Sequence, residues 1–74
     1  MPKLPDLTGG ELVRALERAG FKQQHIRGSH HILRHPDGRA TSVPVHGSQS
    51  LKRGLILGVL RRVNLTVDEL RKLL

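Results

Sequence analysis

A chain of 74 residues is long enough for one domain, and at this size a single hydrophobic core gives only marginal stability. The absence of cysteine excludes disulfides and thiolate metal sites, and a single Phe without Trp or Tyr argues against binding nucleic acid by stacking bases on several aromatic rings. Thirteen Lys and Arg against six Asp and Glu give a formal net charge of +7. This charge favours a polyanionic partner: nucleic acid first, then an acidic protein surface, then anionic lipid.

Residues 1–7 contain two prolines and no apolar run of the kind found in a signal peptide. No stretch of the chain approaches the roughly 18 apolar residues of a membrane span. We therefore expect a cytoplasmic protein that makes no membrane contact.

A first helix is expected over residues 9–19. Thr8 and Glu11 have the spacing of a capping box, in which each side chain accepts a hydrogen bond from the backbone N–H of the other residue. Apolar residues then recur at helical spacing, and Gly20 is a natural terminator.

Three strands are expected next, over residues 21–27, 29–35 and 40–45. Gly28 separates the first two, and the turn signal Pro36-Asp37-Gly38 separates the second from the third. Because Pro44 cannot donate a ladder hydrogen bond, we expect the third strand at an edge of the sheet or paired there only on its other side.

A second amphipathic helix is expected from Leu51 to Val63, with Asn64 suited to its end. Its apolar stripe comprises Leu51, Leu55, Ile56, Val59, Leu60 and Val63. Gly54 and Gly58 each cost about 1 kcal/mol of helix propensity relative to alanine, so we expect the helix backbone to pack closely against the sheet at both positions.

A short last helix is expected after a second capping box, Thr66 to Glu69, provided that its leucines dock on the body of the protein: Leu70, Leu73 and Leu74. The predicted fold is therefore α+β, a single domain over residues 1–74. A three-stranded antiparallel sheet carries helices on one face, in the order α-β-β-β-α plus the short C-terminal helix.

Histidines are clustered around the first hairpin. Four of the five fall within eleven residues, and the fifth, His46, ends the third strand; the four are His25, His30, His31 and His35. Histidine transfers protons near neutral pH, which metal-free phosphodiester cleavage requires. Two other interpretations are solvent-exposed imidazoles on a polar sheet face, and a zinc site formed by His30, His35 and His46. The zinc site has no supporting cysteine or carboxylate motif.

Several short motifs occur in order along nearly the whole chain: Leu12-Val13-Arg14-Ala15-Leu16 before Ala19-Gly20-Phe21, Arg27-Gly28-Ser29-His30-His31, His35-Pro36-Asp37-Gly38-Arg39, Val43-Pro44-Val45-His46-Gly47 and Leu51-Lys52-Arg53-Gly54. In this order and spacing they resemble the HicA family, small toxins of type II toxin–antitoxin systems that degrade messenger RNA. The resemblance implies a fold like that of double-stranded-RNA-binding domains, an mRNA interferase that arrests translation and growth, and a HicB-type antitoxin as the neutralising partner.

The resemblance also implies that His30, the histidine of the Gly-Ser-His motif, is catalytic. We expect the ribose 2′-OH to attack the adjacent phosphorus with His30 as general base or acid, without cofactor or metal, and no residue is assigned as the second proton-transfer group. Gly28 permits either a tight turn or close approach of an RNA backbone. The candidate RNA contacts are Gly28 and Ser29 of the motif and five cations, Lys22, Arg27, Arg34, Lys52 and Arg53.

Two other functions remain open from the residues alone. A non-catalytic double-stranded-RNA-binding module would have the same charge and element order. A DNA-binding antitoxin or repressor fits the charge but not the central three strands.

Overall fold

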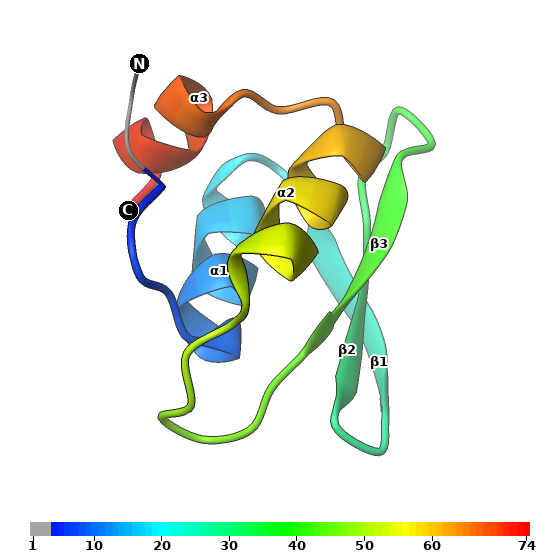
Figure 1. The fold of residues 1–74 in the computed structure, drawn as a ribbon. Coiled ribbons are helices and arrows are strands. Elements are labelled where there is room, and N and C mark those ends of the chain that lie inside the picture. The colour runs from blue at the N-terminus through cyan, green and yellow to red at the C-terminus, as the bar shows by residue number, and fades with distance from the viewer. Residues whose placement is uncertain (1–3) are drawn as a thin grey trace.

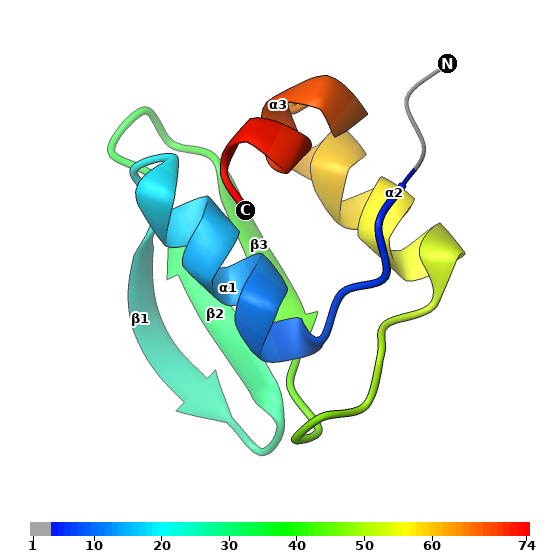
Figure 2. The same cartoon turned by 90° about the vertical axis from the view of Figure 1, so that its left-hand side faces the viewer.

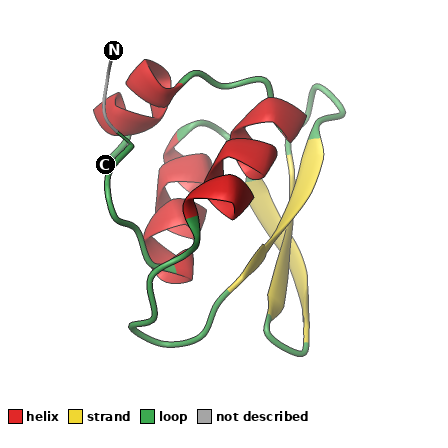
Figure 3. Cartoon of the chain, in the orientation of Figure 1, coloured by secondary structure: helices red, strands yellow, loops and turns green. Residues whose placement is uncertain are grey.

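The computed structural model describes residues 4–74. The elements follow in the order α1 (Gly9–Arg18), β1 (Lys22–Arg27), β2 (His30–Arg34), β3 (Ala40–Pro44), α2 (Arg53–Arg62) and α3 (Val67–Lys72). The strands form one antiparallel sheet in the order β1-β2-β3. Helices α1 and α2 pack on one face of this sheet and leave the other face open (Figure 1, Figure 3). The predicted α+β class and α-β-β-β-α order are confirmed.

Local capping signals place the helix ends. At α1 the Thr8 N–H donates to Glu11 Oε1 at 2.9 Å and the Glu11 N–H donates to Thr8 Oγ1 at 3.2 Å. The same reciprocal pair of bonds opens α3, between Thr66 and Glu69. Helix α1 ends at Arg18 with Ala19 as its C-cap, and the next residue, Gly20, has a φ of 102°, in the left-handed region that follows many helices. Both capping boxes expected from the sequence are confirmed.

The core lies between the helix layer and the inner face of the sheet. It is formed by aliphatic side chains from every element except β1, together with Leu7, Phe21 and Val63; the largest fully buried ones are Leu12, Leu16, Leu33, Ile56, Leu70, Val43 and Val63. In β2 and β3 the alternate residues Leu33 and Val43 are fully buried, so their strand neighbours point to the open face. Burial on one face therefore sets the direction of every side chain in these two strands.

Two expectations about α2 are wrong. Gly54 and Gly58 are exposed, and a Cβ added at either would meet nothing within 4 Å, because both lie on the side of the helix away from the sheet. Leu55, expected in the apolar stripe, is 37% exposed for the same reason.

In α3, Leu70 is buried and Leu73 is half-buried, but Leu74 is 47% exposed and does not dock.

Close packing occurs instead at Gly9, the first residue of α1. A Cβ at this position would collide with the carbonyl oxygen of Pro44 and lie 2.9 Å from the Cα of Val45. The start of α1 is thus seated against the end of β3. β3 is an edge strand, as the proline at its end predicted, and the Val45 N–H extends the pairing by donating to the Ser29 carbonyl at 2.8 Å.

Candidate active site on the open face of the sheet

The open face of the sheet collects basic and imidazole side chains from β1 and β2. His30 and Arg34 lie there because they alternate with the buried Leu33, and their register partners on β1 are Arg27 and Lys22. His25 joins them as the partner of Ile32. All five polar side chains are exposed. The face turns away from α1 and α2, which cover the opposite side of the sheet (Figure 2).

A β-bulge in β1 sets this grouping. The register shifts between Gln23 and His25, so that Gln24 is extra relative to β2. In an unbroken strand Lys22 and His25 would point to opposite faces, because side chains alternate with a period of two. His25 shares the open face with Arg27 by alternation from the hairpin turn, and the extra residue at Gln24 brings Lys22 to the same face. It also explains why residues 21–27 show no clear alternation in the sequence.

His30 lies at the start of β2, next to the turn of the first hairpin. Arg27 is directly opposite it on β1, and Pro44 is its partner on β3. The turn has two residues, Gly28 and Ser29; the φ of 61° at Gly28, with no positive φ at Ser29, matches a type II′ turn. A Cβ at Gly28 would meet nothing within 4 Å, so this turn, not crowding within the chain, accounts for the glycine.

No carboxylate offsets the charge of the open face. All six acidic residues lie outside the strands. Three of them are already held by hydrogen bonds: the Thr8 and Thr66 backbone N–H groups lower the pKa of Glu11 and Glu69, and the Arg39 backbone N–H lowers that of Asp37. The side chain of His30 makes no hydrogen bond or ion pair with any of residues 4–74. The face is therefore free to receive an external anion.

Of the sequence-predicted contacts, the structure groups Lys22, Arg27 and Arg34 with His30 but not the other two cations. Lys52 and Arg53 are exposed at the start of α2, in the helix layer on the other side of the sheet. The segment 45–52 that leads to them starts at the end of the sheet where the β1–β2 turn lies (Figure 1). A ligand touching all five cations has to pass around that end of the sheet.

The remaining histidines lie elsewhere. His31 points to the helix side, as strand alternation predicts, and its Nδ1 lies 3.0 Å from Gln23 Oε1. His46 lies beyond β3 in a turn, where its carbonyl accepts a hydrogen bond from the Gln49 N–H. Within residues 4–74 no three His, Cys, Asp or Glu side chains come together in a way that would hold a metal ion. The suggested convergence of His30, His35 and His46 is thus absent from the described part of the chain.

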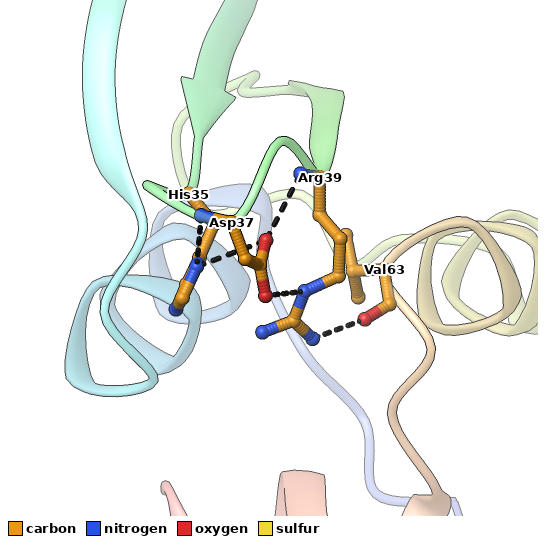
Figure 4. Close-up of polar contacts among 4 residues, drawn as sticks. All are labelled: His35, Asp37, Arg39 and Val63. Atoms are coloured by element: carbon orange, nitrogen blue, oxygen red, sulfur yellow. Dashed lines mark hydrogen bonds and ion pairs between the residues drawn. The ribbon is translucent and has the colours of Figure 1, made fainter.

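His35 belongs to a structural cluster that the sequence did not predict (Figure 4). Its ring packs edge-on against Phe21, 5.0 Å between centroids, and its Nδ1 accepts the Asp37 N–H at 3.1 Å. Arg39 donates from Nε to Asp37 Oδ2 at 2.8 Å and from its terminal nitrogen to the Val63 carbonyl at 2.6 Å. The cluster ties the β2–β3 turn to the end of α2, on the opposite side of the sheet from His30.

The fold and the open face together define a class: a small basic α-β-β-β-α domain that presents an unpaired histidine among cations. No helix in the described chain is long and apolar enough to cross a lipid bilayer. Residues 9–65 match the family model described as the HicA toxin of bacterial toxin–antitoxin systems. The match covers more than half of the chain, from α1 to just beyond α2, and the chain belongs to the HicA toxin family. No curated protein gives a significant match.

Membership of this family makes the chain a toxin of a toxin–antitoxin system, as the sequence motifs indicated, and a toxin of this kind has an antitoxin as its partner.

Proposed function

We propose that this toxin is a cytoplasmic endoribonuclease that cleaves messenger RNA without a metal or other cofactor, arrests translation and growth, and is neutralised by a HicB-type antitoxin. The observation that carries the proposal is the position of His30. It lies exposed and unpaired on a face that holds Lys22, Arg27 and Arg34 and no carboxylate. An imidazole in such surroundings combines proton transfer with attraction for a phosphodiester backbone.

The reaction uses the ribose 2′-OH of the RNA as its nucleophile, so the protein has to supply positioning, charge and proton transfer. His30 acts on a proton of the reacting groups, as general base or acid. Arg27, directly opposite His30 on β1, is placed to stabilise the negative charge that develops on the phosphorane. Lys22 and Arg34 bind flanking phosphates, and the Gly28-Ser29 turn approaches the RNA backbone next to His30.

Lys52 and Arg53 form the outer part of the same RNA-binding surface. They are exposed at the start of α2, so they contact RNA that continues past the β1–β2 turn toward the helix layer. Their contribution is electrostatic and independent of sequence, and it weakens as the salt concentration rises.

The test is incubation of the purified protein with single-stranded and duplex RNA in the presence of a chelator. We expect fragments ending in 2′,3′-cyclic phosphate and 5′-hydroxyl, and no cutting where the ribose is 2′-deoxy or 2′-O-methyl. His30→Ala should lower the cleavage rate by at least about 100-fold. His31→Ala, at the neighbouring position on the opposite face, is the matched control and should lose less activity.

Two results would contradict the proposal. Products with 5′-phosphate that appear only after metal is added would refute the mechanism. Binding of duplex RNA without any cutting would favour the alternative function, a non-catalytic double-stranded-RNA-binding module.

A further inference from the structure

Cleavage through a 2′-OH requires two proton transfers, and the open face carries a second histidine near the first. His30 pairs with Arg27 and His25 pairs with Ile32, so the two histidines are diagonal neighbours on adjacent strands. Diagonal neighbours in an antiparallel sheet are about 7–8 Å apart, which is within reach of ring side chains. Both imidazoles are exposed, and neither makes a hydrogen bond or ion pair with any of residues 4–74.

The other three histidines are less suitably placed. His31 faces the helix side beside Gln23, and His35 packs on Phe21 behind the sheet. His46 follows the paired part of β3 in a turn. Within the strands, His25 alone shares a face with His30, because it lies two residues from Arg27, the direct partner of His30.

We infer that His25 is the second proton-transfer group of the proposed ribonuclease; the inference rests on that proposed function. A neutral His30 takes the proton of the 2′-OH while the 2′-oxygen forms its bond to phosphorus. The bond from phosphorus to the 5′-oxygen then breaks, and protonated His25 gives its proton to that oxygen. The products are a 2′,3′-cyclic phosphate and a 5′-hydroxyl, and exchange of protons with water resets both rings.

The residue directly opposite His25 is Ile32, and the charged and titratable groups that surround His25 on the open face are all cationic or imidazole. They are Lys22 and Arg27 on its own strand and His30 and Arg34 on β2, and no helix packs against this side of the sheet. A phosphodiester bound between the two histidines therefore meets no negative charge from the strands and has one imidazole available for each of the two reacting oxygens.

Substitutions at His25 separate proton transfer from simple attraction of phosphate. His25→Ala and His25→Arg should each slow cleavage by at least about 100-fold. His25→Arg keeps a positive charge but does not exchange protons near neutral pH, so its affinity for uncleavable 2′-O-methyl RNA should match that of the wild type. Because His25 is exposed, both variants should melt at the wild-type temperature. Wild-type activity in His25→Arg would overturn the inference.

A substrate with a better leaving group identifies the role directly. Once the wild-type cut site is mapped, an RNA with sulfur in place of the 5′-oxygen at that site needs no general acid, because a thiolate leaves without a proton. His25→Ala should cleave this RNA at nearly the wild-type rate, and His30→Ala should not. His46→Ala, an exposed histidine outside the strands, is the control and should cleave both RNAs like the wild type.

If the sulfur substrate restored cleavage by His30→Ala or by His46→Ala, and not by His25→Ala, the assignment of His25 as the acid would be refuted. The inference and the proposed function fail in different ways. If the wild type cuts no RNA, the proposed function is wrong; if the wild type cuts RNA and the His25 variants cut it equally fast, only the inference is wrong.

Discussion

Arg39 links three parts of the fold, and its removal should measurably destabilise the toxin. Its guanidinium donates to the Val63 carbonyl at the end of α2 and to Asp37 in the β2–β3 turn. The same group lies over the Phe21 ring, 5.2 Å from its centre. Arg39→Ala removes all three interactions and leaves the Val63 carbonyl without its side-chain donor.

The size of the effect follows from these contacts. A hydrogen bond from a charged donor contributes about 1.5–3 kcal/mol, and a cation–π contact adds about 0.5–1 kcal/mol. The ion pair with Asp37 is half exposed and screened by solvent, so it adds little. Arg39 also borders a pocket of about 530 Å³ beside Asn64 and Leu65, so water can take the place of its side chain and offset part of the loss. We therefore expect a loss of about 2–4 kcal/mol, against a total of about 4–11 kcal/mol for a chain of this length.

Urea denaturation followed by far-ultraviolet circular dichroism measures this loss, since the chain has neither Trp nor Tyr for fluorescence. Arg39→Lys should fall between Arg39→Ala and the wild type, because an ammonium keeps the charge but not the planar fork that reaches two acceptors. Arg34→Ala, on the open face without an ion pair, is the control and should change the free energy of unfolding by less than about 0.5 kcal/mol. An Arg39→Ala protein as stable as that control would refute the reasoning.

Four further predictions concern stability and the partner. Gly58→Ala should stabilise the toxin by about 0.5–1 kcal/mol in the same urea assay, since the site is exposed within α2 and has room for a Cβ; a loss of stability would show that α2 is more crowded than described. Thr41→Val should stabilise it by about 1–3 kcal/mol, because the buried Thr41 hydroxyl has no hydrogen-bond partner, and an unchanged midpoint would contradict this. The pKa values of Glu11, Asp37 and Glu69 are lower in the folded state than their ordinary values of 4.5, 3.8 and 4.5, so the stability they contribute is full above those values and is lost as the pH falls through the lowered ones. Urea midpoints should therefore decline below about pH 4, and less steeply in Glu69→Gln; a flat profile would rule this out. A HicB-type antitoxin that covers the open face should compete with RNA, with association slowing as salt rises, whereas a stable complex of toxin, antitoxin and uncut RNA would point to inhibition at another site.

Features encoded within a few residues were predictable from the sequence, and features set by tertiary packing were not. The capping boxes at Thr8 and Thr66 depend on contacts three residues apart, and both are present as predicted. The exposure of Gly54 and Gly58 depends on how α2 is rotated against the sheet, which local propensity does not specify. The partner of Arg39, at Val63, is 24 residues away in the chain.

In the candidate site, too, local features were predictable from the sequence and features that depend on strand pairing were not. A sequence motif points to His30 as the candidate catalytic residue, and alternation along β2 places His31 on the other face. His25 received no role, because its place beside His30 depends on the register of the hairpin, which pairs Arg27 with His30. The face of Lys22 depends in addition on the bulge at Gln24, and the lack of alternation in a run of polar residues identifies neither the position of the extra residue nor the face that Lys22 occupies.

One long side of β1 has no strand beside it, and all six residues of the strand are exposed. An open strand edge of this kind pairs with the same edge of another copy unless charge keeps the copies apart. Lys22 and Arg27, at the two ends of β1, supply that repulsion. The cations proposed to bind RNA should therefore also oppose self-association of the free toxin, and a variant that loses both should aggregate as well as bind RNA weakly. An acidic antitoxin that neutralises these charges would have to occupy the edge itself, since otherwise it would promote the pairing that the charges oppose.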